Sequence, residues 1–405
     1  MSVATHVTRG ELAAKAGQAP VRAIVTYGAI AALVGGAAFL WALASGQADR
    51  AWQAYHFNFV FFIVIAQALV VFAATQKLAK GHWSGLMIRF AEAAVAFLFL
   101  ALVLFAGLFF GRFHVFGWLQ GAPRPDIGAW FTTKAFFLRN GLILALLAWL
   151  SWRFVRRDLA PDIQELAEGR PVDPDAEEKG RIMRDAAVMT MAFAFGYTLL
   201  GFDFVMSLNH KWMSNLYGAF YFMGGFLGAL GTLAILSLIL RRAMGLEELM
   251  STRQLHDLGK LVFGFTVFWG YLMWAQFLVI WYGNMPEETY FVWYRLWGPW
   301  RPVGAAVFIL VFVVPFAGLL GAKPKKYPPT FLGFTVVSLV GLWLERYLEV
   351  VPSMNRGAGP AIGVPELGVT LLYAGLFLLA LGWFAGRYPM LSPRLAADTL
   401  EREAH

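Results

Sequence analysis

The order of apolar and polar residues divides the chain into ten long apolar stretches separated by short polar connections. About 20 consecutive apolar residues span the hydrocarbon core of a membrane as an α-helix. The stretches are continuous apolar runs, without the strict alternation of a transmembrane barrel. The pattern therefore predicts an all-α polytopic membrane protein with ten transmembrane helices, near residues 21–45, 52–76, 86–111, 134–154, 187–207, 217–240, 260–282, 303–321, 330–349 and 366–387.

Composition and charge give this protein an orientation. Of 405 residues, 59% are hydrophobic and 14% are charged. The two termini and every second connection lie on one side and carry most of the 33 basic residues, so that side is predicted to be cytoplasmic. Basic loops facing anionic lipid headgroups explain the net charge of +8, and no nucleic-acid partner is expected. The first 20 residues are polar and mixed, so we expect no cleavable signal peptide.

Three local similarities suggest that four helices are duplicated, with the second to fifth helices matching the sixth to ninth. They are His82 and His256 before a helix, Trp130 and Trp297 four residues before a basic residue, and Asp203 and Glu345 near a helix end. An even number of helices gives both repeats the same membrane orientation, unlike the inverted repeats of many transporters. The predicted parts are a cytoplasmic segment 1–20, a peripheral helix 21–45, bundle 52–207 with cytoplasmic loop 155–186, bundle 217–349, a peripheral helix 366–387 and a cytoplasmic tail 388–405.

Asp203 and Glu345 are the first candidate functional residues, because each places a carboxylate near the end of a membrane-spanning stretch. An ionisable group within a bilayer costs about 2.5–3.5 kcal/mol on the lenient insertion scale. Glu345 and Glu349 share a helical face, and Arg346 can neutralise one of them. The outer polar layer comprises these groups and others that lie near the same membrane surface: His56, Lys134, Arg139 and His210. A proton route and a charge-balanced structural cluster are both consistent with this layer.

A second, inner layer contains Arg89 with Glu92 and Asp257 with Lys260. Each pair is three residues apart on a helix, so the two side chains can meet. Asp257 can alternatively cap the start of its helix. Neutral polar groups lie between the layers and can support a water chain or simply pack: Gln67, Tyr197, Thr198, Tyr271 and Gln276. Pro315 is expected to kink its helix.

No residue pattern points to a redox centre in this chain. The absence of cysteine excludes disulfides and cysteine-ligated iron–sulfur clusters. The seven histidines lie at the termini, in loops or at predicted helix ends, so none forms the mid-span pair that a bis-histidine haem needs. No metal-ligand spacing, nucleotide-binding glycine loop or nucleophile–base motif is present. We therefore expect no cofactor in this chain and assign no catalytic or metal-binding residue.

Several stretches resemble a known family. The stretch 202–212 (FDFVMSLNHKW), the stretch from 257–260 (DLGK) through Gln276 to 280–289 (IWYGNMPEET), and 343–347 (WLERY) with 351–353 (VPS) are similar to the smaller membrane subunit of bacterial alternative complex III. That subunit belongs to the NrfD-like family, which includes the membrane subunit of polysulfide reductase. The resemblance covers most of the fifth to ninth helices and is weaker before residue 180. Glu345 departs from the aspartate expected there and keeps the acid.

The resemblance implies a respiratory complex of the bacterial inner membrane that oxidises quinol and reduces a cytochrome c or a haem–copper oxidase. In that family, the larger NrfD-like paralogue binds quinol, and periplasmic iron–sulfur and multihaem cytochrome c subunits hold the redox groups. Small membrane subunits and bound lipids are also expected. The smaller subunit contributes a candidate proton path, which here would include Asp203, Glu345 and Glu349 outside, Glu92 and Asp257 inside, and Tyr197, Thr198, Tyr271 and Gln276 between them.

Other classes of function remain open at this point. A quinone-binding protein needs a lateral apolar opening beside the outer layer, with His56 or Asp203 facing the quinone carbonyls. A solute transporter needs a polar site at the membrane midplane, and the sequence offers none. A structural docking subunit needs only charges that balance one another.

Overall fold

The computed structural model describes residues 8–119, 128–209, 212–355 and 359–404, and every regular element in these ranges is helical. Ten helical segments there are long and apolar enough to cross a membrane, which confirms the predicted fold class. They are α2 (Val21–Ala44), α3 (Ala48–Leu78), α4 (Ile88–Glu92) with α5 (Val95–Leu108), α7 (Thr133–Glu168), α8 (Ala176–Phe204), α9 (Tyr217–Ala243), α10 (Thr252–Gly283), α12 (Arg301–Phe308) with α13 (Val314–Leu319), α15 (Pro328–Met354) and α16 (Val364–Ala385).

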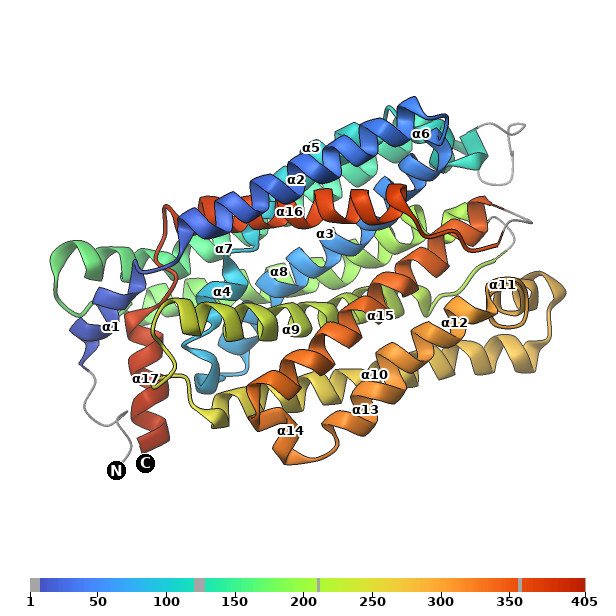
Figure 1. The fold of residues 1–405 in the computed structure, drawn as a ribbon. Helices are drawn as coiled ribbons and strands as arrows, with labels where there is room; N and C mark the ends of the chain where they lie inside the picture. The colour runs from blue at the N-terminus through green and yellow to red at the C-terminus, as the bar shows by residue number, and fades with distance from the viewer. Residues whose placement is uncertain (1–7, 120–127, 210–211, 356–358, 405) are drawn as a thin grey trace.

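Short helices cover the two ends of this array. The helices α1 (Arg9–Ala16) and α17 (Pro393–Ala404) pack together at one end, which we call the inner end in accordance with the predicted orientation (Figure 1). The opposite, outer end carries α6 (Arg112–Val115) and α11 (Pro286–Leu296). The remaining connections include α14 (Ala322–Lys326) and the 3₁₀ turns η2 (His82–Ser84), η3 (Gly117–Leu119), η4 (Gly128–Phe131) and η5 (Met206–Leu208).

The long helices form two four-membered rings. In the first bundle, α3 packs against α5 and α8, and α7 completes the ring by packing against α5 and α8. In the second bundle, α9 packs against α10 and α15, and α13 completes the ring by packing against α10 and α15. The bundles meet where α3 packs against α9 and α15, and where α8 packs against α9. Exchanging α3, α5, α7 and α8 with α9, α10, α13 and α15 maps this set of contacts onto itself. The duplication of four helices in a common orientation stays a prediction.

The helices α2 and α16 lie side by side on the first bundle, where α16 packs against α3 and α5 (Figure 1). Glycine allows the two backbones to come into contact, because a Cβ atom on Gly35 would lie 2.2 Å from the Leu372 nitrogen. A Cβ atom on Gly375 would lie 2.3 Å from the Ala32 nitrogen. Close approach of small residues is the usual means of helix association where the solvent is itself apolar.

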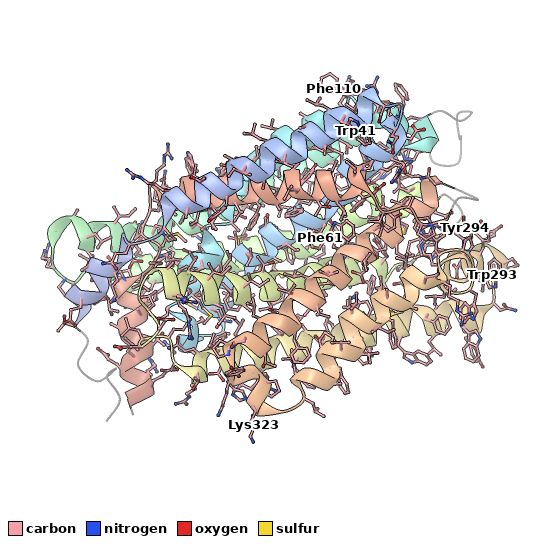
Figure 2. All side chains as sticks on the ribbon, viewed as in Figure 1. Trp41, Phe61, Phe110, Trp293, Tyr294 and Lys323 are labelled. Carbon is pink, nitrogen blue, oxygen red and sulfur yellow. The ribbon has the colours of Figure 1, made fainter. Side chains whose placement is uncertain are left out.

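Burial follows the position of each helix. The central helix α3 is buried along nearly its whole membrane span. Large apolar side chains instead lie exposed on the outside of the molecule, such as Trp41 on α2 and Phe110 in the turn after α5 (Figure 2). The labelled Trp293 lies at the outer end of the molecule, whereas Lys323 lies on α14 at the inner end (Figure 2). An aromatic belt at one interface and basic loops at the other are typical of a membrane protein.

Three predicted helices differ in detail. The helix predicted to end at 154 continues through Pro161 to Glu168, because its buried face recurs at Phe154, Asp158, Asp162 and Glu165. The predicted helix at 86–111 is interrupted between α4 and α5. The helix containing Pro315 forms a π-turn, η6 (Ile309–Val313), immediately before the proline.

Candidate functional site

The outer carboxylate of the first bundle belongs to Asp203, at the end of α8, and four donors surround it. Its Oδ2 atom accepts from Arg139 Nε at 2.9 Å, from Arg139 Nη2 at 2.6 Å and from Asn140 Nδ2 at 2.9 Å. The Trp130 indole donates to Oδ1 at 3.2 Å, and its ring covers the Arg139 guanidinium at 3.9 Å. Asp203 is buried, so this fork of charge-assisted bonds offsets its desolvation.

His56 closes the same end of α8. The last carbonyl groups of a helix have no intrahelical donor. His56 Nε2 lies 2.8 Å from the Phe204 carbonyl oxygen, and the Ser207 hydroxyl donates to the Asp203 carbonyl. His56 is fully buried between the Phe116 and Phe204 rings, so it is a capping residue placed beside Asp203. Its Nδ1 atom has no hydrogen-bond partner among the described residues.

The outer cluster of the second bundle is centred on Glu345 of α15. The Trp269 indole donates to Glu345 Oε1 at 2.6 Å. The other oxygen, Oε2, lies 3.3 Å from Arg346 Nη2 but accepts no hydrogen bond from the described residues. Gly224 of α9 makes room for this arrangement, because a Cβ atom there would lie 2.9 Å from Arg346 Nη2 and 3.5 Å from Glu345 Oε2.

Arg346 is already engaged elsewhere. Its Nη1 donates to Glu349 Oε2, its Nη2 donates to the Tyr221 carbonyl at 3.2 Å, and its guanidinium lies over the Tyr221 ring. The predicted pairing of Arg346 with one of two neighbouring acids is therefore present, and the paired acid is Glu349. Glu345 shares the charge of that arginine without its hydrogen bonds.

A second buried arginine, Arg295 of α11, completes the outer cluster. Its Nε donates to the Leu348 carbonyl at 3.0 Å, and its Nη2 donates to the Glu349 carbonyl at 3.1 Å and to Ser353 Oγ at 2.7 Å. Pro352 explains the first bond: a proline has no N–H, so the carbonyl four residues earlier loses its helical donor. Burial lowers the pKa of Arg295 to about 9, which leaves it protonated at neutral pH. Two acids and two arginines thus occupy this cluster.

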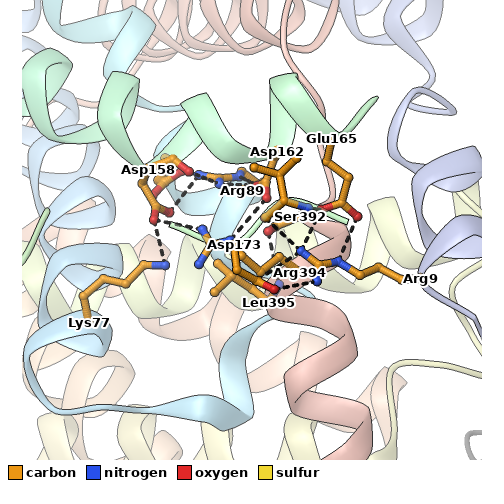
Figure 3. A network of polar contacts seen from close by, with 12 residues as sticks. Arg9, Lys77, Arg89, Asp158, Asp162, Glu165, Asp173, Ser392, Arg394 and Leu395 are labelled. Atoms are coloured by element: carbon orange, nitrogen blue, oxygen red, sulfur yellow. Dashed lines mark hydrogen bonds and ion pairs between the residues drawn. The ribbon is translucent and has the colours of Figure 1, made fainter. Parts of the chain in front are cut away.

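The inner cluster is centred on Arg89 of α4, and Figure 3 shows it with Asp158 and Asp162. Arg89 contacts three carboxylates: that of Glu92 on its own helix, and those of Asp158 and Asp162 on α7. All four side chains are buried. Glu92 Oε1 and Asp162 Oδ1 have no hydrogen-bond partner among the described residues. The predicted Arg89–Glu92 pair is therefore part of a larger network.

Three further elements join the inner cluster. Lys77 of α3 lies 2.9 Å from Asp158 Oδ1, and Arg394 of α17 lies 3.4 Å from the same atom (Figure 3). Beside them, Arg9 of α1 pairs with Glu165 at 2.7 Å and with Asp173 at 3.2 Å. The hydrogen bond from Arg9 holds the pKa of Asp173 below its usual value. These contacts fasten both terminal helices to the inner end of α7.

The second predicted inner pair is separate from this network. Asp257 and Lys260 form an ion pair on α10, but Lys260 is exposed and Asp257 is only partly buried. The suggestion that Asp257 caps its helix is wrong, because α10 begins earlier and Ser251 caps it by accepting from the Gln254 nitrogen at 3.3 Å. The two inner pairs lie in different bundles, so they do not form a single site.

The neutral polar groups predicted between the two layers do not form one connected site in the structure. The Tyr197 hydroxyl donates to the Ile63 carbonyl at 2.8 Å, and Thr198 donates to its own helix at Ala194. Tyr271 is 61% exposed on the outside of α10, and Gln276 is half-buried on the same helix. The predicted water bridge through Tyr197, Thr198, Tyr271 and Gln276 is therefore wrong for Tyr271, because this side chain faces away from the bundle interior. Gln67 donates to Ser151 at 2.7 Å and links α3 to α7.

Two other members of the predicted outer layer are Lys134 and His210. Lys134 is exposed at the start of α7. His210 lies outside the described residues.

One cavity bears on the quinone alternative. It has a volume of about 410 Å³ and lies between α3, α9, α15 and α16, with a lining that is almost wholly apolar: Phe61, Phe62, Ile65, Thr232, Ile235, Val336, Leu339, Val340, Trp343, Leu367, Thr370 and Phe377. Neither His56 nor Asp203 lines it. The Trp343 indole N–H donates hydrogen bonds to Asn58 Oδ1 and Thr370 Oγ1, and the Thr370 hydroxyl donates to the Glu366 carbonyl. The lateral opening required beside His56 and Asp203 is therefore not supplied by this cavity.

Comparison with known proteins adds no assignment, since no family model and no curated protein matches this chain. No group of three or more histidines and carboxylates suited to a metal ion occurs within residues 8–119, 128–209, 212–355 and 359–404.

Several cluster members lie outside the residues that the sequence analysis predicts. Asp158, Asp162 and Glu165 fall within the predicted loop 155–186, although their spacing of four and three residues continues the buried face of α7. That periodicity is the signal that identifies them. Arg295 follows an aromatic run, four residues after Phe291. The only sequence feature that could have drawn attention to it is that it is a single arginine beside this run. Nothing in the sequence places Arg295 opposite Pro352.

Proposed function

We propose that this multi-pass membrane protein is a subunit, without a redox centre of its own, of a quinol-oxidising respiratory complex similar to bacterial alternative complex III. We further propose that Glu345 exchanges protons within it. The stretches that resemble the NrfD-like family support the first part, since they include Asp203 and the Glu345–Arg346 pair of the two outer clusters. The resemblance and the basic inner loops also support residence in a bacterial inner membrane with both termini in the cytoplasm.

The hydrogen bonding of Glu345 is the observation that carries the proton proposal. Asp203 receives four donors, so its charge is fixed in a structural ion pair. Glu345 is equally buried, but its Oε2 atom receives none and its nearest cation is bonded to Glu349. A buried carboxylate oxygen without a donor gains from a proton or a water molecule. Glu345 is thus the outer acid best suited to change its protonation state.

Glu92 is the corresponding acid at the inner end. Its Oε2 atom contacts Arg89, but Oε1 has no donor among the described residues, and Asp158 and Asp162 compete for the same arginine. Asp158 also pairs with Lys77 and Arg394, and Asp162 with Arg394, whereas Glu92 forms an ion pair with Arg89 alone among the described residues. Of these three neighbouring carboxylates, Glu92 is therefore the one on which a proton is most favourable. Glu92 therefore serves as the inner proton-exchanging group in this proposal.

Partner subunits supply the electron transfer. The proposed partners are a larger NrfD-like paralogue that binds quinol, periplasmic iron–sulfur and multihaem cytochrome c subunits, small membrane subunits and a haem–copper oxidase. The exposed aromatic rings at the outer ends of α10 and α11, among them Trp281, Tyr282 and Trp293, provide apolar area for membrane lipid or for a neighbouring subunit. Proton movement would then follow conformational changes transmitted from the paralogue.

A purification tests the assignment to a complex. We expect the tagged full-length chain, extracted from its native membrane in mild detergent, to copurify with haem, iron and quinol-oxidising activity. Recovery of the chain alone, at full yield and without these partners, would contradict the proposal. A structural docking subunit is the second candidate function, favoured by the fully satisfied Asp203 pair. It predicts the same copurification but no effect of Glu345 on proton release.

A further inference from the structure

Several buried polar side chains of α10 and α15 have atoms without a hydrogen-bond partner among the described residues, beginning with Glu345 Oε2. Ser338 lies on the same face of α15, because seven residues on a helix correspond to nearly two full turns. Its side chain is 2% exposed, and its hydroxyl has no partner among the described residues. The two groups are therefore separated along the helix axis by about 10 Å.

The π-turn η6 lies between these two levels. The Val314 N–H donates to the Ile309 carbonyl, in the π pattern, and the next residue, Pro315, has no N–H. Leu310 thus loses both the α-helical and the π-helical donor for its carbonyl. A Cβ atom on Gly341 would lie 2.9 Å from Leu310 Cβ, so this turn packs directly on α15 between Glu345 and Ser338. Single-turn π-bulges of this kind frequently occur at functional sites.

Gln254 is a third such residue, at the inner end of α10. Its side chain is fully buried, and neither its Oε1 nor its Nε2 atom has a partner among the described residues. Trp269, which binds Glu345, lies fifteen residues further along the same helix, or about 22 Å toward the outer end. Three buried side chains, those of Glu345, Ser338 and Gln254, thus lie at successive depths along α15 and α10, and each has an atom without a hydrogen-bond partner among the described residues.

We infer that the second bundle holds a file of bound water molecules, extending from Glu345 past the Leu310 carbonyl and Ser338 toward Gln254. Buried polar groups in proteins are nearly always bonded, and ordered water supplies the partner where protein does not. A water molecule makes two to four such bonds, so it can bridge neighbouring polar groups. The presence of the water file does not depend on the proposed function. Its consequence does, which is that protons reach Glu345 from the inner end by this route.

Radiolytic hydroxyl labelling of the full complex tests the file, because hydroxyl radicals formed from bound water oxidise the side chains beside it. We expect labelling of buried residues near 308–314 and 334–342 in the native protein. Ser338→Val, which removes the hydroxyl and fills its space, should lower this labelling at least threefold. Ser237→Ala is the matched control: Ser237 is also buried and without a described partner. It lies thirteen residues after Gly224 and therefore faces away from the second bundle.

Absence of labelling in the native protein, or equal labelling in the Ser338→Val protein, overturns the water file whatever the role of Glu345. Labelling that is lost in Ser338→Val, together with normal proton release by a Glu345→Gln complex, supports the file and contradicts the proposed function. If the water file and the proton exchange at Glu345 are both correct, Ser338→Val should slow proton release at least fivefold, and Ser237→Ala should leave it unchanged.

Discussion

The Nε atom of Arg295 donates to the carbonyl of Leu348 at 3.0 Å, the carbonyl that Pro352 deprives of its helical donor. A side chain on the outer helix α11 thereby replaces a backbone bond of α15. The same guanidinium adds a positive charge beside Glu349. Arg295 therefore replaces a missing helical hydrogen bond and also offsets the negative charge of the outer cluster.

Replacing Arg295 with Met should destabilise the protein by about 2–4 kcal/mol, because it leaves buried carbonyl groups without a donor. Pro352→Ala returns an N–H that can reach the Leu348 carbonyl. The cost of Arg295→Met should therefore be about 1 kcal/mol smaller in the Pro352→Ala background. Thermal unfolding of the four proteins in detergent measures this coupling. The exposed Arg301→Met is the control, and additive effects would show that the two residues do not share a carbonyl.

The Asp203–Arg139 pair should behave as a structural ion pair. Arg139→Gln should cost about 3–5 kcal/mol, since it leaves the buried Asp203 carboxylate without its cation. Asp203→Asn should cost less, because the Arg139 side chain that it leaves is 17% exposed. The double variant should cost less than the sum of the two. Unfolding midpoints provide the cycle, with the exposed Lys134→Gln as a control that stays within about 0.5 kcal/mol. Strict additivity would argue against a structural role for this pair.

Neighbouring glycines of α2 test its packing on α16. Gly35→Val places a side chain against the Leu372 backbone, where neither partner can move aside, and should cost about 1–3 kcal/mol. Gly36→Val is the matched control, because the nearest atom to its Cβ is 4.0 Å away. Equal unfolding temperatures for the two variants would show that α2 does not contact α16 in this way.

The clamp between Arg9 and Asp173 should depend on pH. The pKa of Asp173 is lowered in the folded protein, so the contact is present above the unfolded value of about 3.9 and is lost as the pH falls through the folded value. Hydrogen exchange in α1 should accordingly increase over that acidic range. Asp173→Asn should remove this part of the pH dependence, and an unchanged profile would contradict it.

The sequence was sufficient to predict features that depend on local pattern. The ten spans follow from runs of apolar residues, and the Arg89–Glu92 and Arg346–Glu349 pairs follow from a spacing of three on a helix. It was insufficient where partners come from distant helices. Lys77, Asp158 and Arg394 belong to three different helices. Only the packing of these helices brings Lys77 and Arg394 to Asp158, which in turn contacts Arg89.

The distinction between Asp203 and Glu345 was likewise out of reach from sequence. Both are acids at the end of a membrane span, and their local sequence does not reveal how many donors each receives. Arg139 and Asn140 reach Asp203 from α7, whereas the arginine beside Glu345 is held by Glu349. This difference depends on side-chain geometry between helices, which periodicity does not encode.

The central claim is that Glu345 exchanges protons during quinol oxidation. The most direct test measures protons released per electron pair by the complex in sealed vesicles, comparing the native protein with Glu345→Gln. We expect the variant to retain quinol oxidation and to lose most of the coupled proton release, while an assembled Asp203→Asn complex keeps the native ratio. An unchanged ratio in an assembled Glu345→Gln complex would contradict the claim.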